Sequence, residues 1–330
     1  SQSLFSISNI KKSVRKMINE KVENFLNAPP DSIGLGDISK SKVKDETYIY
    51  WGDEPIGKIK KGKSIYRPSV EALNSEYLST ENKLLISAKL QKWLDSKIKD
   101  TIHPLTKNLD EEMNSEIRAV AFNCMENFGN YPIEKFKLSL KKISQESKLQ
   151  LSKLGIRIGA KYLFIPNLLK KNPLELCAVL WKTFYKCELN EFLPLPQNGR
   201  VSFTSEVKMP NNYWQSIGYI KIKNFIFRID VFEKIFFLAR QKIKKGPFLE
   251  TSDLMNPIGC NSDQLKDIMV FCGYDYLTIA DGKKLYLLNK NRKDSKKIIK
   301  NKEKKLNKKN KTNKIKRDPN SPFAVLKKLL

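Results

Sequence analysis

The sequence predicts a mainly α-helical fold with small β-hairpins, in which a helical bundle precedes a winged-helix-like unit and a disordered lysine-rich tail. Three observations predict this class. Apolar residues recur at spacings of three and four between positions 80 and 154, which is the period of amphipathic helices. Three helical patterns and a hairpin then follow one another from 230 to 289, in the element order of a winged helix. From 290 to 317 the apolar period disappears and lysine dominates.

The length of 330 residues suggests two or three domains, and the 40% hydrophobic content is enough for a buried core. Ser1 stands where a Met is expected, so we expect a fragment or a processed chain. The expected segments are a connector of one helix and a β-hairpin (1–66), a helical bundle (67–154), an α+β accessory domain ending in the winged-helix-like unit (155–289), a disordered basic linker (290–317) and a C-terminal docking helix (318–330).

The connector begins with a helix expected over 7–27, where apolar residues follow one side and basic residues the other. Residues 48–51 and 56–60 flank a Gly-Asp-Glu-Pro turn, and this pattern predicts a β-hairpin.

Residues 57–64 read GKIKKGKS, which matches the phosphate-loop pattern G-x-x-x-x-G-K-[ST]. Such a loop needs a helix to begin at its Lys-Ser pair, because the N–H groups of that helix bind the phosphates. Pro68 disfavours a helical conformation at Arg67 and leaves only three residues for this helix. We therefore expect the lysine-rich edge of a hairpin. A free-standing NTPase that uses this loop is the less favoured alternative.

Three helices are expected in the bundle, and Pro104, Gly129 and Gly155 mark their ends. Their apolar positions are Ile86, Leu90, Trp93 or Leu94, Ile98 and Ile102 in the first, Met113, Ile117, Val120, Cys124 and Phe128 in the second, and Ile133, Phe136, Leu140, Ile143 and Leu151 in the third. The short connections between them favour a compact bundle.

The accessory domain starts with a glycine-bracketed block, GIRIGAKYLFIP, at 155–166. A helix is expected over 173–189 with Asn172 as its N-cap, and hairpins are expected at 219–228 and 277–287. The third helix of the winged-helix-like unit, SDQLKDIMVFC, carries no arginine. We therefore expect it to serve structure or protein contact rather than base reading.

The formal net charge is +27, which favours polyanionic partners because basic side chains displace counterions from phosphates. Lysine outnumbers arginine 53 to 9, although nucleic-acid sites usually favour arginine, and an AT-rich genome also encodes many lysines. We expect RNA as the partner, with DNA as the alternative. The candidate contacts in the folded part are Arg157, Lys161, Arg200, Lys221 and Lys223.

Arg157 and Lys161 are candidates because they lie in and just after the glycine-bracketed block, where the backbone can approach a ligand closely. The alternative is that Arg157 pairs with a core carboxylate such as Glu175.

The linker, 290–317, carries a net charge of +13, and its self-repulsion favours an extended chain. Two interpretations of this linker are equally favoured. It binds nucleic acid without regard to sequence, or it is a solvated spacer. The candidate contacts there are Lys296, Lys297, Lys304, Lys305, Lys308 and Lys309.

The last residues predict a short helix, because Ser321 can cap it and Pro322 can take its first position. Phe323, Leu326 and Leu330 then share one face and could dock on a partner. A frayed terminus is the alternative.

The five scattered cysteines and the single histidine make zinc sites and histidine-based catalysis improbable. An odd number of cysteines fits reduced, buried thiols in a cytoplasmic protein. No run of eighteen apolar residues occurs, so we expect no membrane span. The scattered cysteines and the single histidine also lead us to expect no metal site.

Several short blocks resemble, in their order along the chain, the region after the motor in bacterial relatives of the mitochondrial degradosome RNA helicase, which belongs to helicase superfamily 2. The blocks are YWGDEPI at 50–56, RAVAF at 118–122, LGIRIG at 154–159, YLFIPNLLK at 162–170, GPF at 246–248, LM at 254–255, GC at 259–260 and SPFAVL at 321–326.

The resemblance implies an RNA-contacting accessory region of an ATP-dependent RNA helicase. It implies no catalytic residue and no cofactor in this segment, since ATP and Mg²⁺ would belong to a missing upstream motor. It also implies a ribonuclease or another degradosome-type protein as a partner. A basic protein–protein adaptor, whose tail only ensures solubility, is the alternative from another class.

Overall fold

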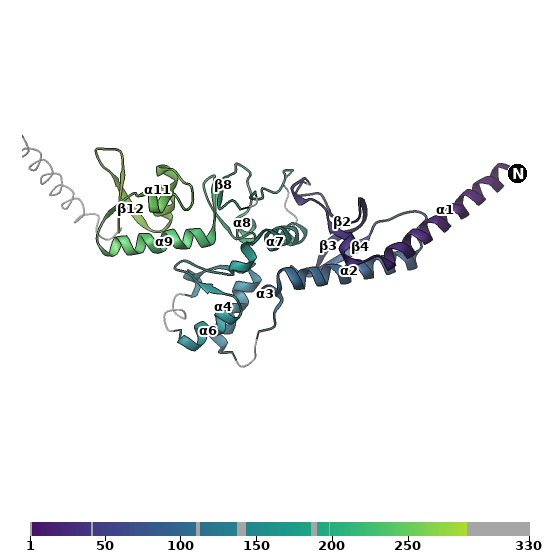
Figure 1. The fold of residues 1–330 in the computed structure, drawn as a ribbon, viewed down its shortest axis with the longest axis horizontal. Helices are drawn as coiled ribbons and strands as arrows, with labels where there is room; N and C mark the ends of the chain where they lie inside the picture. The colour runs from purple at the N-terminus through teal and green to yellow at the C-terminus, as the bar shows by residue number, and fades with distance from the viewer. Residues whose placement is uncertain are drawn as a thin grey trace, which may run out of the picture. The chain divides into compact units, whose positions relative to one another are not determined.

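The computed structural model describes residues 2–288 except positions 41, 110–112, 137–142, 186–189 and 198 (Figure 1). The chain divides into two compact units. The first comprises Ser1–Phe237 and Pro257–Gly259, and the second comprises Leu238–Asn256 and Cys260–Leu330. The predicted linker and docking helix lie outside the described residues.

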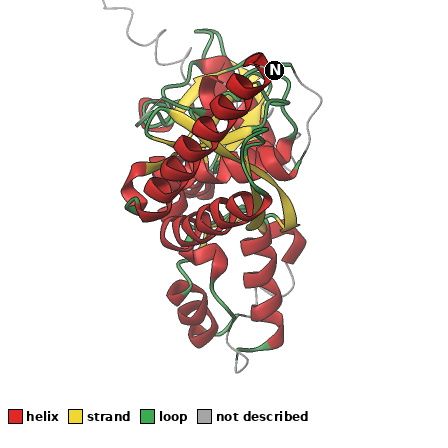
Figure 2. Cartoon of the chain, turned by 90° about the vertical axis from the view of Figure 1, so that its right-hand side faces the viewer, coloured by secondary structure: helices red, strands yellow, loops and turns green. Residues whose placement is uncertain are grey.

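The predicted fold class is wrong, because strands and helices are mixed along the chain. The described part has ten α-helices and four small antiparallel sheets, an α/β arrangement rather than a mainly helical fold with a winged-helix-like unit. Figure 2 shows the yellow strands set among the red helices. Strands as short as β6, Arg157–Ile158, and β11, Phe248–Leu249, leave no alternating period in the sequence.

The first unit contains a four-stranded antiparallel sheet with the order β1-β2-β3-β4. Its strands are β1 Ile33–Leu35, β2 Thr47–Trp51, β3 Glu54–Ser64 and β4 Arg67–Ala72. The pairing of β2 with β3 confirms the predicted hairpin. Helix α2, Thr80–Thr101, packs on β4, and the hydroxyl of Ser79 caps it by accepting the N–H of Asn82. Leu90 and Leu94 of α2 are fully buried, so this helix closes the core on one side of the sheet.

Helix α1, Gln2–Asn27, packs on α2, and among its described side chains the buried ones lie near its end. Val22 and Phe25 are buried, whereas Ile10 and Met17 are exposed. The ammonium of Lys89 on α2 donates to three backbone carbonyls that end α1. These hydrogen bonds reach Phe25, Leu26 and Ala28 at 2.8, 2.9 and 2.6 Å.

The helices that follow agree only partly with the predicted bundle. They are α3 His103–Thr106, α4 Ser115–Glu126 and α6 Gln145–Lys153. Helix α4 confirms the second predicted helix, with Ile117, Val120 and Cys124 buried. The third predicted helix is interrupted by the 3-10 turn η3, Ile133–Phe136, because the N–H of Ile133 instead donates to the carbonyl of Lys161 at the end of a sheet.

Two three-stranded sheets and two helices complete the first unit. The sheets are β5-β7-β6, built from β5 Asn130–Pro132, β6 and β7 Tyr162–Phe164, and β8-β10-β9, built from β8 Ser202–Thr204, β9 Tyr219–Ile222 and β10 Phe225–Arg228. The 3-10 turn η4, Pro166–Leu169, leads into α7, Lys171–Phe184, and α8, Asn211–Ser216, precedes β9. Trp181, Tyr213 and Trp214 are buried between these elements, with edge-to-face ring contacts at 4.9 and 5.1 Å.

The second unit is built around one three-stranded sheet, β11-β13-β12. Its elements are β11, α10 Ser252–Met255, α11 Ser262–Phe271, β12 Tyr274–Thr278 and β13 Lys284–Leu288, after the last part of α9, Ile229–Lys244. The pairing of Leu277 with Leu285 confirms the predicted hairpin. Asn261 and Gln264 form a capping box that begins α11.

None of the helices in the described ranges is both long enough and apolar enough to cross a membrane.

Candidate functional site

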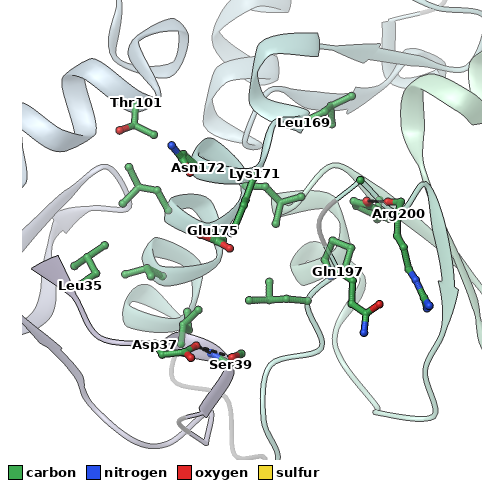
Figure 3. A pocket seen from close by; sticks show the side chains of 18 of the residues that line it. Leu35, Asp37, Ser39, Thr101, Leu169, Lys171, Asn172, Glu175, Gln197 and Arg200 are labelled. Carbon is green, nitrogen blue, oxygen red and sulfur yellow. Dashed lines mark hydrogen bonds between the residues drawn. The ribbon is translucent and has the colours of Figure 1, made fainter.

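A cavity of about 700 Å³ lies in the first unit beside the start of α7 (Figure 3). Four segments far apart in the sequence form its walls. They are the loop after β1 with Leu35, Asp37 and Ser39, the end of α2 with Lys97 and Thr101, the first turns of α7 with Lys171, Asn172 and Glu175, and the loop before β8 with Leu195, Pro196, Gln197 and Arg200. This is the size of a small-molecule or nucleotide site.

The helical period of α7 brings three of its cavity-lining side chains to one face. Lys171, Glu175 and Val179 are four residues apart and therefore share one face of the helix. Cys177 and Trp181 lie on the face that packs into the core, where both are 1% exposed. Figure 3 shows Glu175 near the middle of the view, with Asp37 and Ser39 on one side and Gln197 and Arg200 on the other.

The cavity carries more positive than negative charge that is free to meet a ligand. Lys97, Lys171 and Arg200 line it, and none of them forms an ion pair with another described residue. Glu175 is half-buried and accepts no hydrogen bond from the residues that the structure describes. Because this carboxylate has no partner among the described residues, its oxygens are available to accept hydrogen bonds from a ligand in the cavity.

Two other charged groups at the cavity are already engaged. Nε and Nη2 of Arg228 bind the carboxylate of Asp230 at 2.7 and 3.0 Å, and this pairing raises the pKa of Arg228. The carboxylate of Asp37 accepts the N–H and the hydroxyl of Ser39, which lowers the pKa of Asp37. Lys40 reinforces this shift from 3.4 Å. These groups are therefore less available to a ligand than Lys171 and Glu175.

The five predicted contacts of the folded part do not meet at one site. Arg200 lines the cavity, whereas Arg157 is exposed on β6 and forms no ion pair with Glu175. Lys223 is exposed at the β9–β10 turn. The ammonium of Lys221 donates to the carbonyls of residues 205 and 207 at 3.3 and 2.9 Å. The six predicted lysines of the linker, and Phe323, Leu326 and Leu330, lie outside the described residues.

Sequence reasoning missed Lys97 and Lys171, and it considered Glu175 only as a partner for Arg157. The signal that could have found the α7 pair is the spacing of four between Lys171 and Glu175, which places both on one face of a helix. Lys97 joins them only through the tertiary fold, so its place had no local signal.

The glycine-bracketed block has a structural function that the sequence did not reveal. The carboxylate of Glu233 on α9 accepts the backbone N–H groups of Ala160, Lys161 and Tyr162, the last two at 3.0 and 2.8 Å. A Cβ at Gly159 would lie 2.4 Å from Cδ of Glu233, so only glycine leaves room for the carboxylate. We call this contact the Glu233 clamp.

Lys161 belongs to the same region and is largely covered. Its side chain is 19% exposed, and its ammonium lies 3.9 Å from Glu134 and 5.7 Å from the ring centre of Phe236. Burial raises the pKa of Glu233, although the three N–H groups and Lys161 oppose that shift.

The GKIKKGKS stretch, 57–64, lies within strand β3 rather than in a phosphate-binding loop. It pairs with β2 and β4 on its two sides, and Ser64 pairs with Arg67 across a tight turn. In the described chain no helix begins at Ser64. A Cβ at Gly57 would lie 2.4 Å from Leu90 of α2, so this glycine serves helix–sheet packing.

Lys63→Ala is expected to leave the affinity of the chain for ATP unchanged, because an exposed lysine near the end of strand β3 has no helix N-terminus beside it to bind phosphate. Isothermal titration calorimetry with ATP and Mg²⁺ on both proteins checks this. A micromolar site that disappears in the variant would contradict it.

Three of the four described cysteines are buried, as predicted. They are Cys124, Cys177 and Cys260, whereas Cys272 is half-buried, and none of the four forms a disulfide with another described residue. Burial raises the pKa of both Cys124 and Cys177 to about 12, so neither is a ready nucleophile. Within the described ranges, His, Cys, Asp and Glu side chains form no group of three that could hold a metal ion.

Comparison with known proteins gives no match to any family model, curated protein or solved structure. The resemblance to the degradosome helicase family therefore stays a prediction.

Proposed function

We propose that this chain is a nucleic-acid-binding accessory region that acts beside an ATP-dependent RNA helicase motor, with RNA as its partner and DNA as the alternative. The observation that carries the binding part is the cavity beside α7, where Lys97, Lys171 and Arg200 have no carboxylate partner among the described residues. Cations held without partners at a concave surface are suited to phosphate groups.

The overall charge supports the same proposal. Of the net charge of +27, the linker carries +13, and the remaining +14 belongs to the rest of the chain. Both parts of the molecule would therefore favour association with nucleic acid, because each would release counterions from the phosphate backbone.

The helicase setting of the proposal is supported by the order of the short sequence blocks, which resembles the region after the motor in that family. In this setting ATP and Mg²⁺ act at the motor, the location is cytoplasmic, and a ribonuclease or similar protein is a further partner. Strand β3 supports the absence of a phosphate loop at 57–64.

The test measures the affinity of the full chain for single-stranded RNA and DNA by fluorescence anisotropy over a series of salt concentrations. We expect the logarithm of affinity to fall with the logarithm of salt, with a slope of about −0.7 for each phosphate neutralised. Absence of salt-dependent binding to either nucleic acid would overturn the proposal and favour the protein–protein adaptor.

Replacement of the lysines of 290–317 by glycine and serine, with 318–330 kept, is expected to flatten the salt slope and to weaken all sequences alike. Lysine contacts phosphate as a mobile point charge and does not read bases. Anisotropy titrations of the variant and the parent chain give the two slopes. An unchanged slope and affinity would show that the basic residues that bind nucleic acid lie in the folded part and that the linker is only a spacer.

A further inference from the structure

The cavity beside α7 combines a carboxylate without a partner, several cations and aliphatic walls. We propose that it binds one unpaired guanine nucleotide of a single strand, with the base at Glu175 and the phosphates at Lys171 and Arg200. This inference rests on the proposed function and adds a base preference to it.

The carboxylate of Glu175 selects the base. An ionised carboxylate has only acceptors, on two oxygens side by side. Guanine presents two adjacent donors, N1–H and the N2 amino group, on its Watson–Crick edge. Adenine and cytosine place a ring acceptor beside their amino group, and uracil flanks its single N–H with two carbonyls. Single strands leave this edge open to a protein, so guanine is the base that satisfies Glu175 best.

Three cations line the cavity that holds Glu175, and we assign to them the phosphate contacts of the same nucleotide. Lys171 precedes Glu175 by one helical turn on the same face of α7, and Arg200 comes from the opposite wall beside Gln197 (Figure 3). Lys97 at the end of α2 adds a third positive charge. Phosphate contacts of this kind fix the position of a strand without reading its sequence.

The remaining walls suit the flat faces of a base. Leu35, Leu195 and Pro196 supply apolar surface around the charged groups, and the volume of about 700 Å³ falls within the range of ligand sites. An aliphatic wall with a few directed polar groups is the usual composition of a site that orients one small ligand.

The experiment compares two short single-stranded RNAs that are uridine throughout except for one central guanine or one central adenine. Each is titrated against the full chain by fluorescence anisotropy. We expect the guanine strand to bind about tenfold more tightly, the discrimination typical of one paired contact to a base edge. Glu175→Gln, which replaces one acceptor by a donor, should reduce that ratio to about one.

Two further variants keep the result interpretable. Lys171→Gln should weaken both strands alike and keep the preference for guanine, because it removes a phosphate contact. Glu23→Gln changes an exposed carboxylate of α1 and should leave both affinities unchanged. Thermal melting followed by circular dichroism confirms that each variant is folded.

Equal affinity of the wild type for the two strands, or a preference for guanine that survives Glu175→Gln, would overturn this inference. In both cases salt-dependent binding would remain and the proposed function would stand. Failure of the wild type to bind any strand would overturn both.

Discussion

Glu233→Ala is expected to lower the free energy of unfolding by about 3 kcal/mol, because it leaves three backbone donors of the glycine-bracketed turn without their acceptor. Each buried donor that loses its partner costs about 1–3 kcal/mol. Water can reach part of this half-buried turn, and the variant no longer has to bury a carboxylate, so the total is smaller than three full penalties.

Urea denaturation followed by circular dichroism measures this difference. Gly159→Ala should give a loss in the same direction, since its Cβ would lie 2.4 Å from Cδ of Glu233 and 2.7 Å from the carbonyl oxygen of Tyr162. Because both changes break the same contact, the double variant should lose less than the sum of the single losses. Glu23→Ala on the exposed part of α1 is the matched control. A midpoint for Glu233→Ala equal to that of the control would show that the Glu233 clamp contributes nothing.

The same carboxyl predicts a pH dependence with a definite sign. Burial raises the pKa of Glu233 in the folded state above its ordinary value of 4.5, so the folded chain keeps this proton to higher pH than the unfolded chain. The stability that the fold gains from holding this proton is therefore complete at pH values below the ordinary pKa, and it is lost as pH rises through the folded pKa. Relative to Glu233→Gln, which does not titrate, the wild type should become less stable over this range.

The sequence predicted those elements whose signals are local. The β2–β3 hairpin has a turn between alternating residues, α4 has an apolar stripe from Ile117 to Cys124, and the β12–β13 hairpin has an Asp-Gly turn. Each of these patterns fits within about 15 residues, so neighbouring residues decide the structure. The predicted fold class was wrong because other elements form through contacts between distant residues. An example is the sheet that joins β5 to the two-residue β6 through β7.

The candidate site was still less predictable. Its residues Asp37, Lys97, Glu175 and Arg200 come from four distant segments, and only the tertiary fold brings them to one cavity. Arg200 was predicted from its charge alone. Glu233 lies more than 70 residues from the turn that it holds, so the glycine-bracketed block looked like a ligand loop although its N–H groups bind an internal carboxylate. Backbone donors in such a turn suit any anion, and the sequence does not show which anion is present.

Lys89→Met is expected to release the end of α1 from α2, at a cost of about 2 kcal/mol, because it removes a cation that binds three carbonyls. The carbonyls of Phe25, Leu26 and Ala28 lie at the C-terminal end of a helix, where the last carbonyls have no N–H donor within the helix. A positive charge at this end also interacts favourably with the helix dipole. Methionine keeps much of the length and apolar surface of the lysine stem, so the change removes mainly the charge and the hydrogen bonds.

Hydrogen–deuterium exchange with mass spectrometry measures this effect at residues 22–27, which are the last turns of α1. A loss of about 2 kcal/mol corresponds to roughly 30-fold faster exchange of these amides, if they exchange by undocking of the helix. The global urea midpoint should change less, because only α1 depends on this contact. Lys92→Met on the exposed side of α2 is the matched control and should leave exchange at 22–27 unchanged. Equal protection in Lys89→Met and the control would mean that packing of Val22 and Phe25 alone holds α1 in place.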